Sequence, residues 1–593
     1  MTKTLFTTHA VDILLCLIAS LLFYQISIWH IEFAMINGEY TPAFPDSFYH
    51  AVRILDSIEH GGLLQFDPKI HAPDGAWIVW PWGYDWFIAR IIELVMFITD
   101  INPVKIMAHI PPLWGIVNIA LMVSLCRTLE LAFPYRILVI SCFIFLPLNQ
   151  QLHLIGRIDH HYMELTMVLL STILSLQWFR FTESKLYAIS VGMVLGGSMA
   201  IHNSMFVLQA PVIASLIIYW LLARPLPKTT LHFSLSLLLS TLLFLITSET
   251  FREYTFSFYH YSFFHLYISF CVSIFALIIS RIPLSKKNIS LIVSLMIICA
   301  FPLVNNLISG YEFISGDIEF LHSMGEVKSF MSFDSTQRIS LVEAVSNYSA
   351  FICLLPFTLG YLLYLVCHKT ELSKIYFILF SLMAIFFLLK QMRFHYFGSF
   401  ILYTPLALFF QNSSRLVSAK NIRFLIFMLL ILLAYSLPAK TLFKAQPKSQ
   451  LFEATYWASS ELRKQCDNDT GIILAPAEVG HYLRYFTNCS IIANSFIMDP
   501  KDFKFLRKTK QLLDMNSQQL YSYQEDIKYL FLFREDNIYM NLPDKEVDSI
   551  NSRLTKELIF SDVFPDNYKL LYEIKVDIKN KQYVFARAFK IIR

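Results

Sequence analysis

The sequence predicts a polytopic α-helical membrane protein of about 13 transmembrane helices, followed by a C-terminal mixed α/β soluble domain. Of 593 residues, 56% are hydrophobic and 16% aromatic, and the mean hydropathy is +0.52. Soluble domains are only about 45–50% apolar. Charged residues make up 16% of the chain, where roughly a quarter is usual. Apolar runs long enough to cross a bilayer recur up to residue 438 and then stop.

A spanning helix needs about 20 mostly apolar residues. Runs of this kind lie near residues 10–30, 103–126, 135–151, 162–179, 187–203, 206–223, 231–248, 263–280, 289–308, 345–366, 373–390, 395–411 and 422–438. The first run follows a single Lys3 and precedes no small-residue cleavage site, which favours a retained helix over a cleaved signal peptide. Segment 82–99 is interrupted by Asp85 and Arg90 and leads straight into Asn102-Pro103. We predict that this segment is an interfacial helix and not a span.

The distribution of basic residues predicts the orientation of these helices. Cytoplasmic loops carry an excess of Lys and Arg. With a cytoplasmic N-terminus, alternate loops are basic: Arg127 and Arg136; Arg180 and Lys185; Arg224 and Lys228; Arg281, Lys286 and Lys287; Lys369 and Lys374; Arg415, Lys420 and Arg423. Thirteen spans then place the long loops 31–102 and 309–344, and the domain 440–593, on the non-cytoplasmic side. We therefore expect an inner-membrane protein with a transmembrane part at 1–439 and a periplasmic or extracellular C-terminal domain.

The C-terminal part alternates short apolar runs with polar turns, as in GIILAPAEVG, NCSIIANSF, KYLFLFRED and KQYVFARAFKII. Helical stretches near 449–464 and 500–515 lie between them, and this alternation is typical of a mixed α/β domain. In an oxidising compartment Cys466 and Cys489 could form a disulfide, or they could remain two free thiols. The net charge of +4 comes from basic residues scattered in short loops, so no nucleic-acid partner is predicted.

Two predicted outer loops contain acidic residues and histidines. The first opens with Pro45-Asp46-Ser-Phe-Tyr-His50, where Asp46 could cap a helix or serve a site. The next is the short loop Arg157-Ile-Asp159-His160-His161, between two apolar helices. Its polar residues could simply cap the following helix. Ionisable side chains at membrane depth are costly and usually functional, and a carboxylate and an imidazole two residues apart can hold one divalent cation. We therefore predict a metal site at this loop.

Two further residues of the predicted outer side carry weaker signals. Glu326 is a single glutamate in a loop of about 35 residues. The ordinary explanation for such a residue is a solvent-exposed charge without a specific role. Arg393 lies on the outer side, against the charge bias, at the start of an apolar helix. It could snorkel to the interface, or it could hold a phosphate, to which arginine binds bidentately. Together these residues form the set that an enzyme acting on a lipid-linked phosphorylated donor would need.

The order of these motifs resembles the catalytic subunit of oligosaccharyltransferase, in its single-subunit archaeal and bacterial forms. The shared features are D-x-x-Y-H after the first helix, P-x-G and W-P, D-H-H-x-x-E after the third helix, a loop glutamate, and R-F at a helix start. The resemblance covers nearly the whole chain. It implies the GT-C membrane glycosyltransferase fold and the transfer of a glycan from a polyprenyl (pyro)phosphate carrier to a protein asparagine, with inversion at the anomeric carbon.

The resemblance also implies roles for single residues. Asp46, Asp159 and His161 would bind Mn²⁺ or Mg²⁺, and Asp46 and Glu326 would hold the acceptor amide. The donor phosphate would be bound by Arg393 and His160, and the acceptor would be recognised by Glu478 and His481. The implied partners are a polyprenyl-linked glycan donor, a protein or peptide acceptor and membrane lipid.

One motif departs from this family. Its soluble domain carries W-W-D-Y-G, which recognises the Ser or Thr of the N-x-S/T acceptor. Here the matching stretch is Pro476-Ala477-Glu478-Val479-Gly480-His481-Tyr482, in which Glu478 stands in place of the aspartate and both tryptophans are missing. A GT-C transferase with a lipid or polysaccharide acceptor is therefore the alternative enzyme hypothesis. A non-catalytic membrane protein or a transporter is a further alternative, although the charges gather at one membrane face and not at the bilayer midplane.

Overall fold

The computed structural model describes residues 2–78, 80–315, 328–332, 338–368, 371–413, 419–444, 450–496, 502–523, 526–534, 551–578 and 581–593. The chain divides into two compact units. Unit 1 comprises residues 1–34, 80–84 and 108–445, and unit 2 comprises residues 35–79, 85–107 and 446–593. Glu326 lies outside the described residues.

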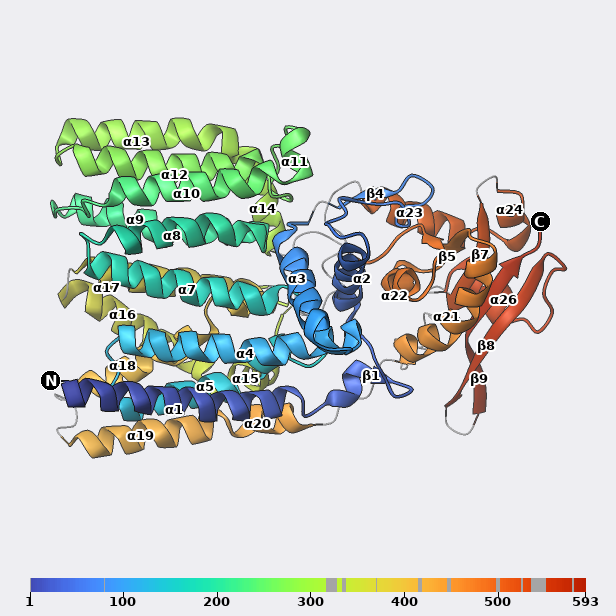
Figure 1. Ribbon diagram of the computed structural model, residues 1–593, viewed down its shortest axis with the longest axis horizontal. Coiled ribbons are helices and arrows are strands. Elements are labelled where there is room, and N and C mark those ends of the chain that lie inside the picture. Colours follow the sequence, from blue (N-terminus) through green and yellow to red (C-terminus); the bar gives the residue numbers. More distant parts are fainter. Residues whose placement is uncertain are drawn as a thin grey trace. The chain divides into compact units, whose positions relative to one another are not determined.

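Unit 1 is a bundle of long apolar helices that lie side by side (Figure 1). Its helices are α1 (Thr2–Ser27), most of α4 (Pro103–Thr128), α5 (Phe133–Phe145), α6 (Pro147–Leu152), α7 (His161–Arg180), α8 (Lys185–Gly197), α9 (Gln209–Leu221), α10 (Thr230–Ile246), α11 (Glu249–Arg252), α12 (Phe263–Arg281), α13 (Lys286–Ala300), α14 (Val304–Ser315), α15 (Leu341–Tyr348), α16 (Leu355–His368), α17 (Leu372–Lys390), α18 (Thr404–Asn412), α19 (Lys420–Ala434) and α20 (Ser436–Phe443).

Seven helices of the described residues are long and apolar enough to cross a membrane, and two bent helix pairs would raise this number to nine. Three shorter apolar helices are Phe133–Phe145, Lys185–Ala200 and Thr230–Ile246. The chain is therefore an integral, multi-pass membrane protein. The predicted count of thirteen spans stays a prediction, because several of the proposed spans are short or broken helices.

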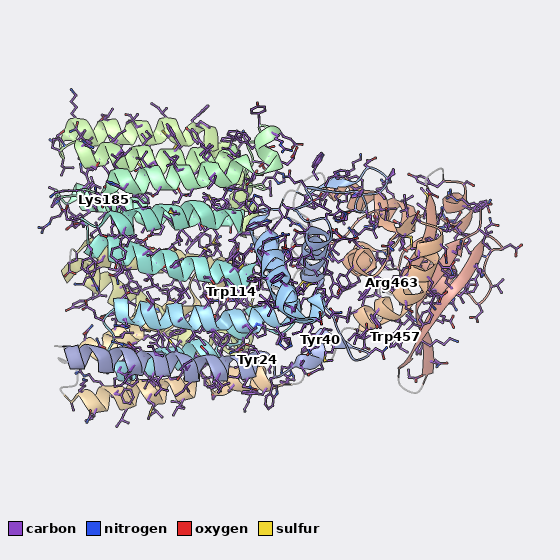
Figure 2. All side chains as sticks on the ribbon, viewed as in Figure 1. Tyr24, Tyr40, Trp114, Lys185, Trp457 and Arg463 are labelled. Atoms are coloured by element: carbon purple, nitrogen blue, oxygen red, sulfur yellow. A yellow bond between two sulfur atoms is a disulfide. The ribbon has the colours of Figure 1, made fainter. Side chains whose placement is uncertain are left out.

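The basic loops of unit 1 gather at one end of the bundle, as ion pairs between successive connections show. Arg136 and Arg127, on either side of the α4–α5 connection, approach the Asp12 carboxylate of α1 at 2.8 and 3.4 Å. Arg180 at the end of α7 lies 3.2 Å from Glu130. Lys185 lies at the same end of the bundle as the N-terminus (Figure 2). This clustering is what the positive-inside rule requires of loops that share one membrane face.

Unit 2 is built on a five-stranded sheet of order β6-β5-β7-β9-β8. Its strands are β5 (Ile472–Leu474), β6 (Ser490–Ile491), β7 (Ile527–Phe533), β8 (Tyr568–Ile578) and β9 (Lys581–Ile591). Strand β5 runs parallel to β6 and β7, whereas β9 is antiparallel to β7 and β8. The helices of this part are α21 (Gln450–Asn468), α22 (Gly480–Phe486), α23 (Asp502–Leu513), α24 (Ser517–Tyr521) and α26 (Arg553–Ile559). The predicted mixed α/β class is confirmed, and a disulfide joins Cys466 to Cys489.

Most of the first predicted outer loop, residues 35–79 and 85–102, belongs to unit 2. It contains α2 (Pro45–Glu59), two short hairpins, β1–β2 (Met35–Ile36 and Glu39–Tyr40) and β3–β4 (Phe66–Asp67 and Ala76–Trp77), and leads into α3 (Gly83–Ile98). Phe48 of α2 is fully buried against Phe452, Tyr482 and Phe486 of α21 and α22. This loop is therefore part of the core of the soluble unit.

Helix α3 covers the segment predicted to be interfacial. The carboxylate of Asp85 is fully buried and binds two side chains of α2 within unit 2, His50 Nδ1 at 2.7 Å and Arg53 at 2.8 Å. Burying a carboxylate costs free energy unless ion pairs and hydrogen bonds offset the loss of water. The acidic residue that interrupts the apolar pattern of 82–99 thus fixes α3 to α2. Its placement at a membrane interface stays a prediction.

Candidate metal centre

The D-H-H loop lies between α6 and α7, at the end of unit 1 opposite the basic loops. Gly156 adopts a φ of +79°, which favours glycine. Its amide donates to the carbonyl of Ala108, and the amide of Ile155 donates to that of Ser27. These bonds hold the loop against α4 and α1. Asp159 and His160 are buried at 4% and 3% exposure, so this short loop presents its ionisable groups to the interior of the bundle end.

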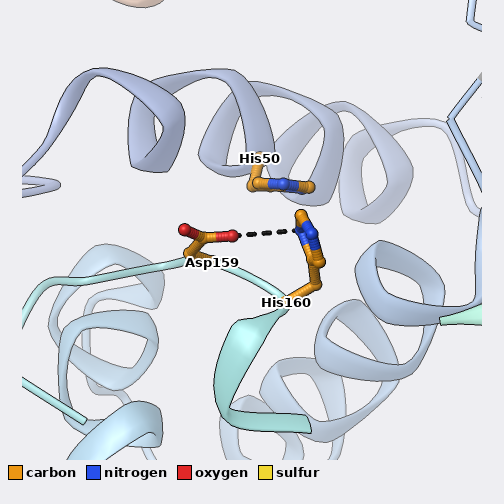
Figure 3. A group of neighbouring side chains, drawn as sticks. All are labelled: His50, Asp159 and His160. Carbon is orange, nitrogen blue, oxygen red and sulfur yellow. Dashed lines mark ion pairs between the residues drawn. The ribbon is translucent and has the colours of Figure 1, made fainter. Parts of the chain in front are cut away.

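The Asp159 carboxylate lies between two imidazoles. Its Oδ1 is 3.0 Å from Nδ1 of His160 (Figure 3), and its Oδ2 is 3.6 Å from Nε2 of His161. The second distance exceeds that of a good hydrogen bond. It is close to the separation of two ligand atoms on one cation, about 3.0–3.5 Å for metal–ligand bonds near 2.1 Å. The spacing between Asp159 and His161 therefore suits a shared divalent ion.

Glu164 orients His161 toward Asp159. It lies one turn into α7, is fully buried, and its Oε2 is 2.5 Å from Nδ1 of His161. An ionised carboxylate only accepts hydrogen bonds, so the Nδ1 of His161 donates to Glu164 and the Nε2 of the same ring faces Asp159. Metal-binding histidines usually donate their second nitrogen to a carboxylate in this way. The other oxygen of Glu164 lies 2.9 Å from Nδ1 of His202.

His202 completes a second set of possible ligands. It precedes the 3₁₀ turn η3 (Asn203–Leu208), and one ligand atom each from His160, Glu164 and His202 lie within 4.8 Å of one another. The rings of His160 and His202 stack with centroids 4.9 Å apart, and Trp80 packs on both. The first set is Asp159 and His161, and both sets lie on the D-H-H loop, on α7 or beside them. The described residues therefore offer a compact centre of two carboxylates, Asp159 and Glu164, and three imidazoles, those of His160, His161 and His202.

The electrostatic state of the loop suits metal binding. Burial raises the pKa of Asp159, but the neighbouring His161 and His160 lower it further, so that it lies well below its usual value. Burial lowers the pKa of His160 to about 4, against the opposing charge of Asp159. At neutral pH Asp159 is therefore an ionised carboxylate and His160 a neutral imidazole, the forms in which these groups bind metals. A cation at His161 would have to displace the Nε2 proton that faces Asp159.

Arg393 lies in the 3₁₀ turn η8 (Met392–Phe397) after α17. Tyr396 of the same turn stacks on the ring of His161 at 5.0 Å, so the turn reaches the candidate metal centre. The amide of Met392 donates to the carbonyl of Lys328, and the amide of Phe330 donates to that of Leu389. These bonds attach the chain two residues beyond Glu326 to the turn that carries Arg393.

The remaining predicted site residues lie in unit 2. Asp46 is half-buried in the first turn of α2, whose N-cap is Phe44. The capping interpretation of Asp46 is therefore wrong, although an acid in the first turn still suits the helix dipole. His50, which is also drawn in Figure 3, is bound to Asp85 as described above.

The stretch that replaces W-W-D-Y-G forms the turn Ala477–Val479 and the start of α22. Glu478 is exposed there. His481 is buried, with its Nε2 2.7 Å from the hydroxyl of Ser495, and burial lowers its pKa to about 3. A Cβ at Gly480 would lie 2.3 Å from the carbonyl oxygen of Ala493, so glycine is needed at this close approach. Glu478 and His481 thus occupy different environments, one facing solvent and one in the core.

Three residues of the centre had no predicted role. Glu164 belongs to D-H-H-x-x-E, and its i,i+3 spacing from His161 could have revealed the contact. His202 and Tyr396 lie 41 and 235 residues beyond His161. Their proximity depends on how α8 and α17 pack, for which one sequence holds no signal.

Solved structures with the same fold identify its architecture. An apo crystal structure of the oligosaccharyltransferase from Archaeoglobus fulgidus matches with a TM-score of 0.76 at 15% identity, over 95% of this chain and 79% of that chain. The same protein tethered to an acceptor peptide with the NVT sequon matches with a TM-score of 0.71 at 15% identity, over 95% and 79%. Its complex with an inhibitory peptide and a dolichol-phosphate matches with a TM-score of 0.72 at 14% identity, over 95% and 80%.

A more distant structural match is the arabinofuranosyltransferase AftD from Mycobacteria, with a TM-score of 0.52 at 11% identity, over 98% of this chain and 41% of that chain. No protein-family profile and no curated protein sequence matches the chain. At these identities the likeness establishes the fold. The predicted class, a GT-C-like helical membrane part with a C-terminal α/β domain, is confirmed.

Proposed function

We propose that this chain is a metal-dependent, inverting glycosyltransferase that moves a glycan from a polyprenyl (pyro)phosphate carrier to a protein asparagine. The observation that carries the proposal is the pairing of Asp159 and His161 at 3.6 Å, oriented by Glu164, in a chain with the oligosaccharyltransferase fold. The Archaeoglobus fulgidus protein has been seen with dolichol-phosphate and with an NVT peptide. Those ligands match the donor and acceptor classes proposed here.

The residues of the centre suit a divalent cation. Carboxylates suit Mg²⁺ and Mn²⁺, whereas imidazoles suit transition metals and zinc. A centre with both types of ligand favours Mn²⁺ over Mg²⁺, and the Archaeoglobus fulgidus protein has been crystallised with zinc and sulfate. A bound cation would neutralise charge on the leaving phosphate.

Residues of the chain would bind the donor phosphate and the acceptor amide. Arg393 holds the donor phosphate, with His160 beside it, and Glu164 keeps the ring of His161 in place. Asp46 and Glu326 keep the roles that the resemblance implies, which are to hold the acceptor amide and, for Asp46, to bind metal. The acceptor nitrogen attacks the anomeric carbon, the bond from that carbon to the carrier phosphate breaks, and the nitrogen loses one proton. One displacement inverts the anomeric configuration.

Reporter fusions test the proposed location on the non-cytoplasmic face. We expect a periplasmic-active reporter fused after Pro438 to be active, and the same reporter fused near Lys287 to be silent. A cytoplasm-active reporter should give the reverse pattern, so each fusion is the control for the other. The reason is that Lys287 belongs to the basic loops, which remain in the cytoplasm. A silent periplasmic reporter after Pro438 would place unit 2 in the cytoplasm and contradict the proposed acceptor.

A second candidate function follows from the turn at Glu478, because the two tryptophans of the family motif are missing there. Buried tryptophans supply large, rigid contact area, and a site built around a hydroxyl can discriminate by about 10⁴-fold or more against its absence. Here Glu478 is exposed beside Pro476 and Ala477. This observation favours an acceptor other than the N-x-S/T sequon, such as a lipid or a polysaccharide.

Transfer to synthetic peptides separates the two functions. Peptides with Thr, Ser or Ala at the +2 position should differ by only about tenfold in kcat/KM, because an exposed carboxylate offers no enclosed pocket for the hydroxyl. Glu478→Ala should change these values little. Strict dependence on Thr or Ser that Glu478→Ala abolishes would show that the domain still reads a sequon. Failure of every peptide, with transfer to a lipid or polysaccharide, would establish the second candidate.

A further inference from the structure

Unit 2 contains a cavity of about 400 Å³ that none of the predicted site residues lines. Its walls come from β2, the beginning of α4, and the facing sides of α21 and α22. Tyr40 and Arg463, which are labelled in Figure 2, lie on two of these walls. The volume falls within the range of about 300–1,000 Å³ that is typical of small-molecule sites.

The lining combines aromatic rings with hydrogen-bonding groups. Tyr40, Tyr456 and Tyr485 contribute rings and hydroxyls, and the ammonium of Lys105 lies 5.7 Å from the centre of the Tyr40 ring. The guanidinium of Arg463 is held at the wall because its Nε donates to the carbonyl of Phe486 at 2.6 Å. Such a lining suits a ligand with both an apolar face and many hydroxyl groups. A lipid chain would leave these polar groups without partners.

Ser459 gives independent evidence for a ligand. It lines the cavity with 1% of its surface exposed. Its hydroxyl has no hydrogen-bond partner among the described residues. Leaving a buried hydroxyl unpaired costs about 1–3 kcal/mol, and such groups in native structures need an explanation. The oxygen exposes less than 1 Å² in this side-chain position, so a ligand hydroxyl would supply the missing partner once the Ser459 side chain turned toward the cavity.

We propose that this cavity binds a saccharide. Tyrosine rings contact the C–H faces of a sugar ring, while Ser459, Arg463 and the tyrosine hydroxyls bind its hydroxyl groups. The biological role of such a site rests on the proposed function, because a glycosyltransferase must bind parts of the glycan that lie away from the bond it breaks. Saccharide binding itself is measured without transfer, which keeps the two hypotheses separable.

The test uses the full chain in lipid nanodiscs and saturation-transfer NMR with three probes: chitotriose, maltotriose and trigalacturonate. We expect binding of at least one probe to the wild-type chain, and a loss of at least about tenfold in affinity for Ser460→Trp. Ser460 is exposed and lines the cavity, so an indole there blocks the cavity without removing core contacts. Asn468→Trp, at an exposed position of α21 that does not line the cavity, is the matched control and should bind normally.

Absence of binding by all three probes would overturn the proposal, and so would undiminished binding by Ser460→Trp. Equal loss in Ser460→Trp and Asn468→Trp would also overturn it, because the effect would then come from α21 as a whole. Glycan transfer is measured on the same preparations. A chain that binds a probe through this cavity but transfers no glycan would refute the proposed function and leave the saccharide site standing.

Discussion

Replacing Asp159 by alanine should lower glycan transfer by about 10³-fold or more and leave the fold intact. The carboxylate is the acidic group of the D-H-H loop and lies 3.0 Å from His160 and 3.6 Å from His161. Without it, the cation would lose the carboxylate that lies between His160 and His161, and with that carboxylate part of the charge that compensates the cation. Residues that only orient metal ligands are already worth about 10–100-fold in metal affinity, so a direct ligand should be worth more. The measurements are transfer in membranes and Mn²⁺ affinity by calorimetry.

Glu183→Ala is the matched control for this substitution. Glu183 is an exposed carboxylate between α7 and α8, 3.2 Å from the equally exposed Lys228. Exposed pairs of this kind contribute about 0–1 kcal/mol, so transfer and metal affinity should both stay near wild-type values. Chelation of the wild-type protein by EDTA should reproduce the effect of Asp159→Ala, and added Mn²⁺ should reverse it. Full activity in EDTA would refute the metal role, even if Asp159→Ala were inactive.

The helices could be predicted from sequence, and the D-H-H loop could be singled out as a candidate metal site, because their signals are local. The apolar runs predict the long helices of unit 1, and the basic residues predict which loops lie at the same end of the bundle. Both signals can be read from short stretches of chain. The D-H-H loop stands out because it places three ionisable residues between two apolar helices. Ionisable residues at membrane depth cost free energy and are usually functional. In unit 2, KYLFLFRED and KQYVFARAFKII correspond to the neighbouring strands β7 and β9.

The tertiary contacts could not be predicted in the same way. In the sequence, Asp85 is visible only as an interruption of an apolar segment, because its partners His50 and Arg53 lie more than 30 residues earlier. His202 joins Glu164 because a helix turns back along the bundle, and no short-range pattern encodes that packing. Phe48 enters the core of unit 2 from a loop about 400 residues before α21. One sequence carries no information about such pairs, since their proximity arises only when the chain is folded.

Arg393→Ala should raise the KM for the polyprenyl-linked donor and lower kcat/KM by about 10²-fold. Arg393 lies in the same 3₁₀ turn as Tyr396, which stacks on His161 of the candidate metal centre. Hydrogen bonds to charged groups contribute about 1.5–3 kcal/mol, and arginine binds phosphate through two parallel bonds. Arg393→Lys keeps the charge and loses the bidentate geometry, so we expect an intermediate loss of about tenfold. Donor titrations at fixed acceptor concentration measure both parameters.

Lys390→Ala provides the control that separates phosphate binding from snorkelling. Lys390 ends α17, three residues before Arg393, and its ammonium lies 5.1 Å from the ring centre of Tyr311. If Arg393 only carried its charge to the membrane interface, Arg393→Ala and Lys390→Ala should both lower the melting temperature slightly and leave the donor KM unchanged. If Arg393 binds the donor phosphate, only its own replacement should raise that KM, and the order should be wild type, then lysine, then alanine. An unchanged donor KM in Arg393→Ala would refute the phosphate role and establish the interfacial one.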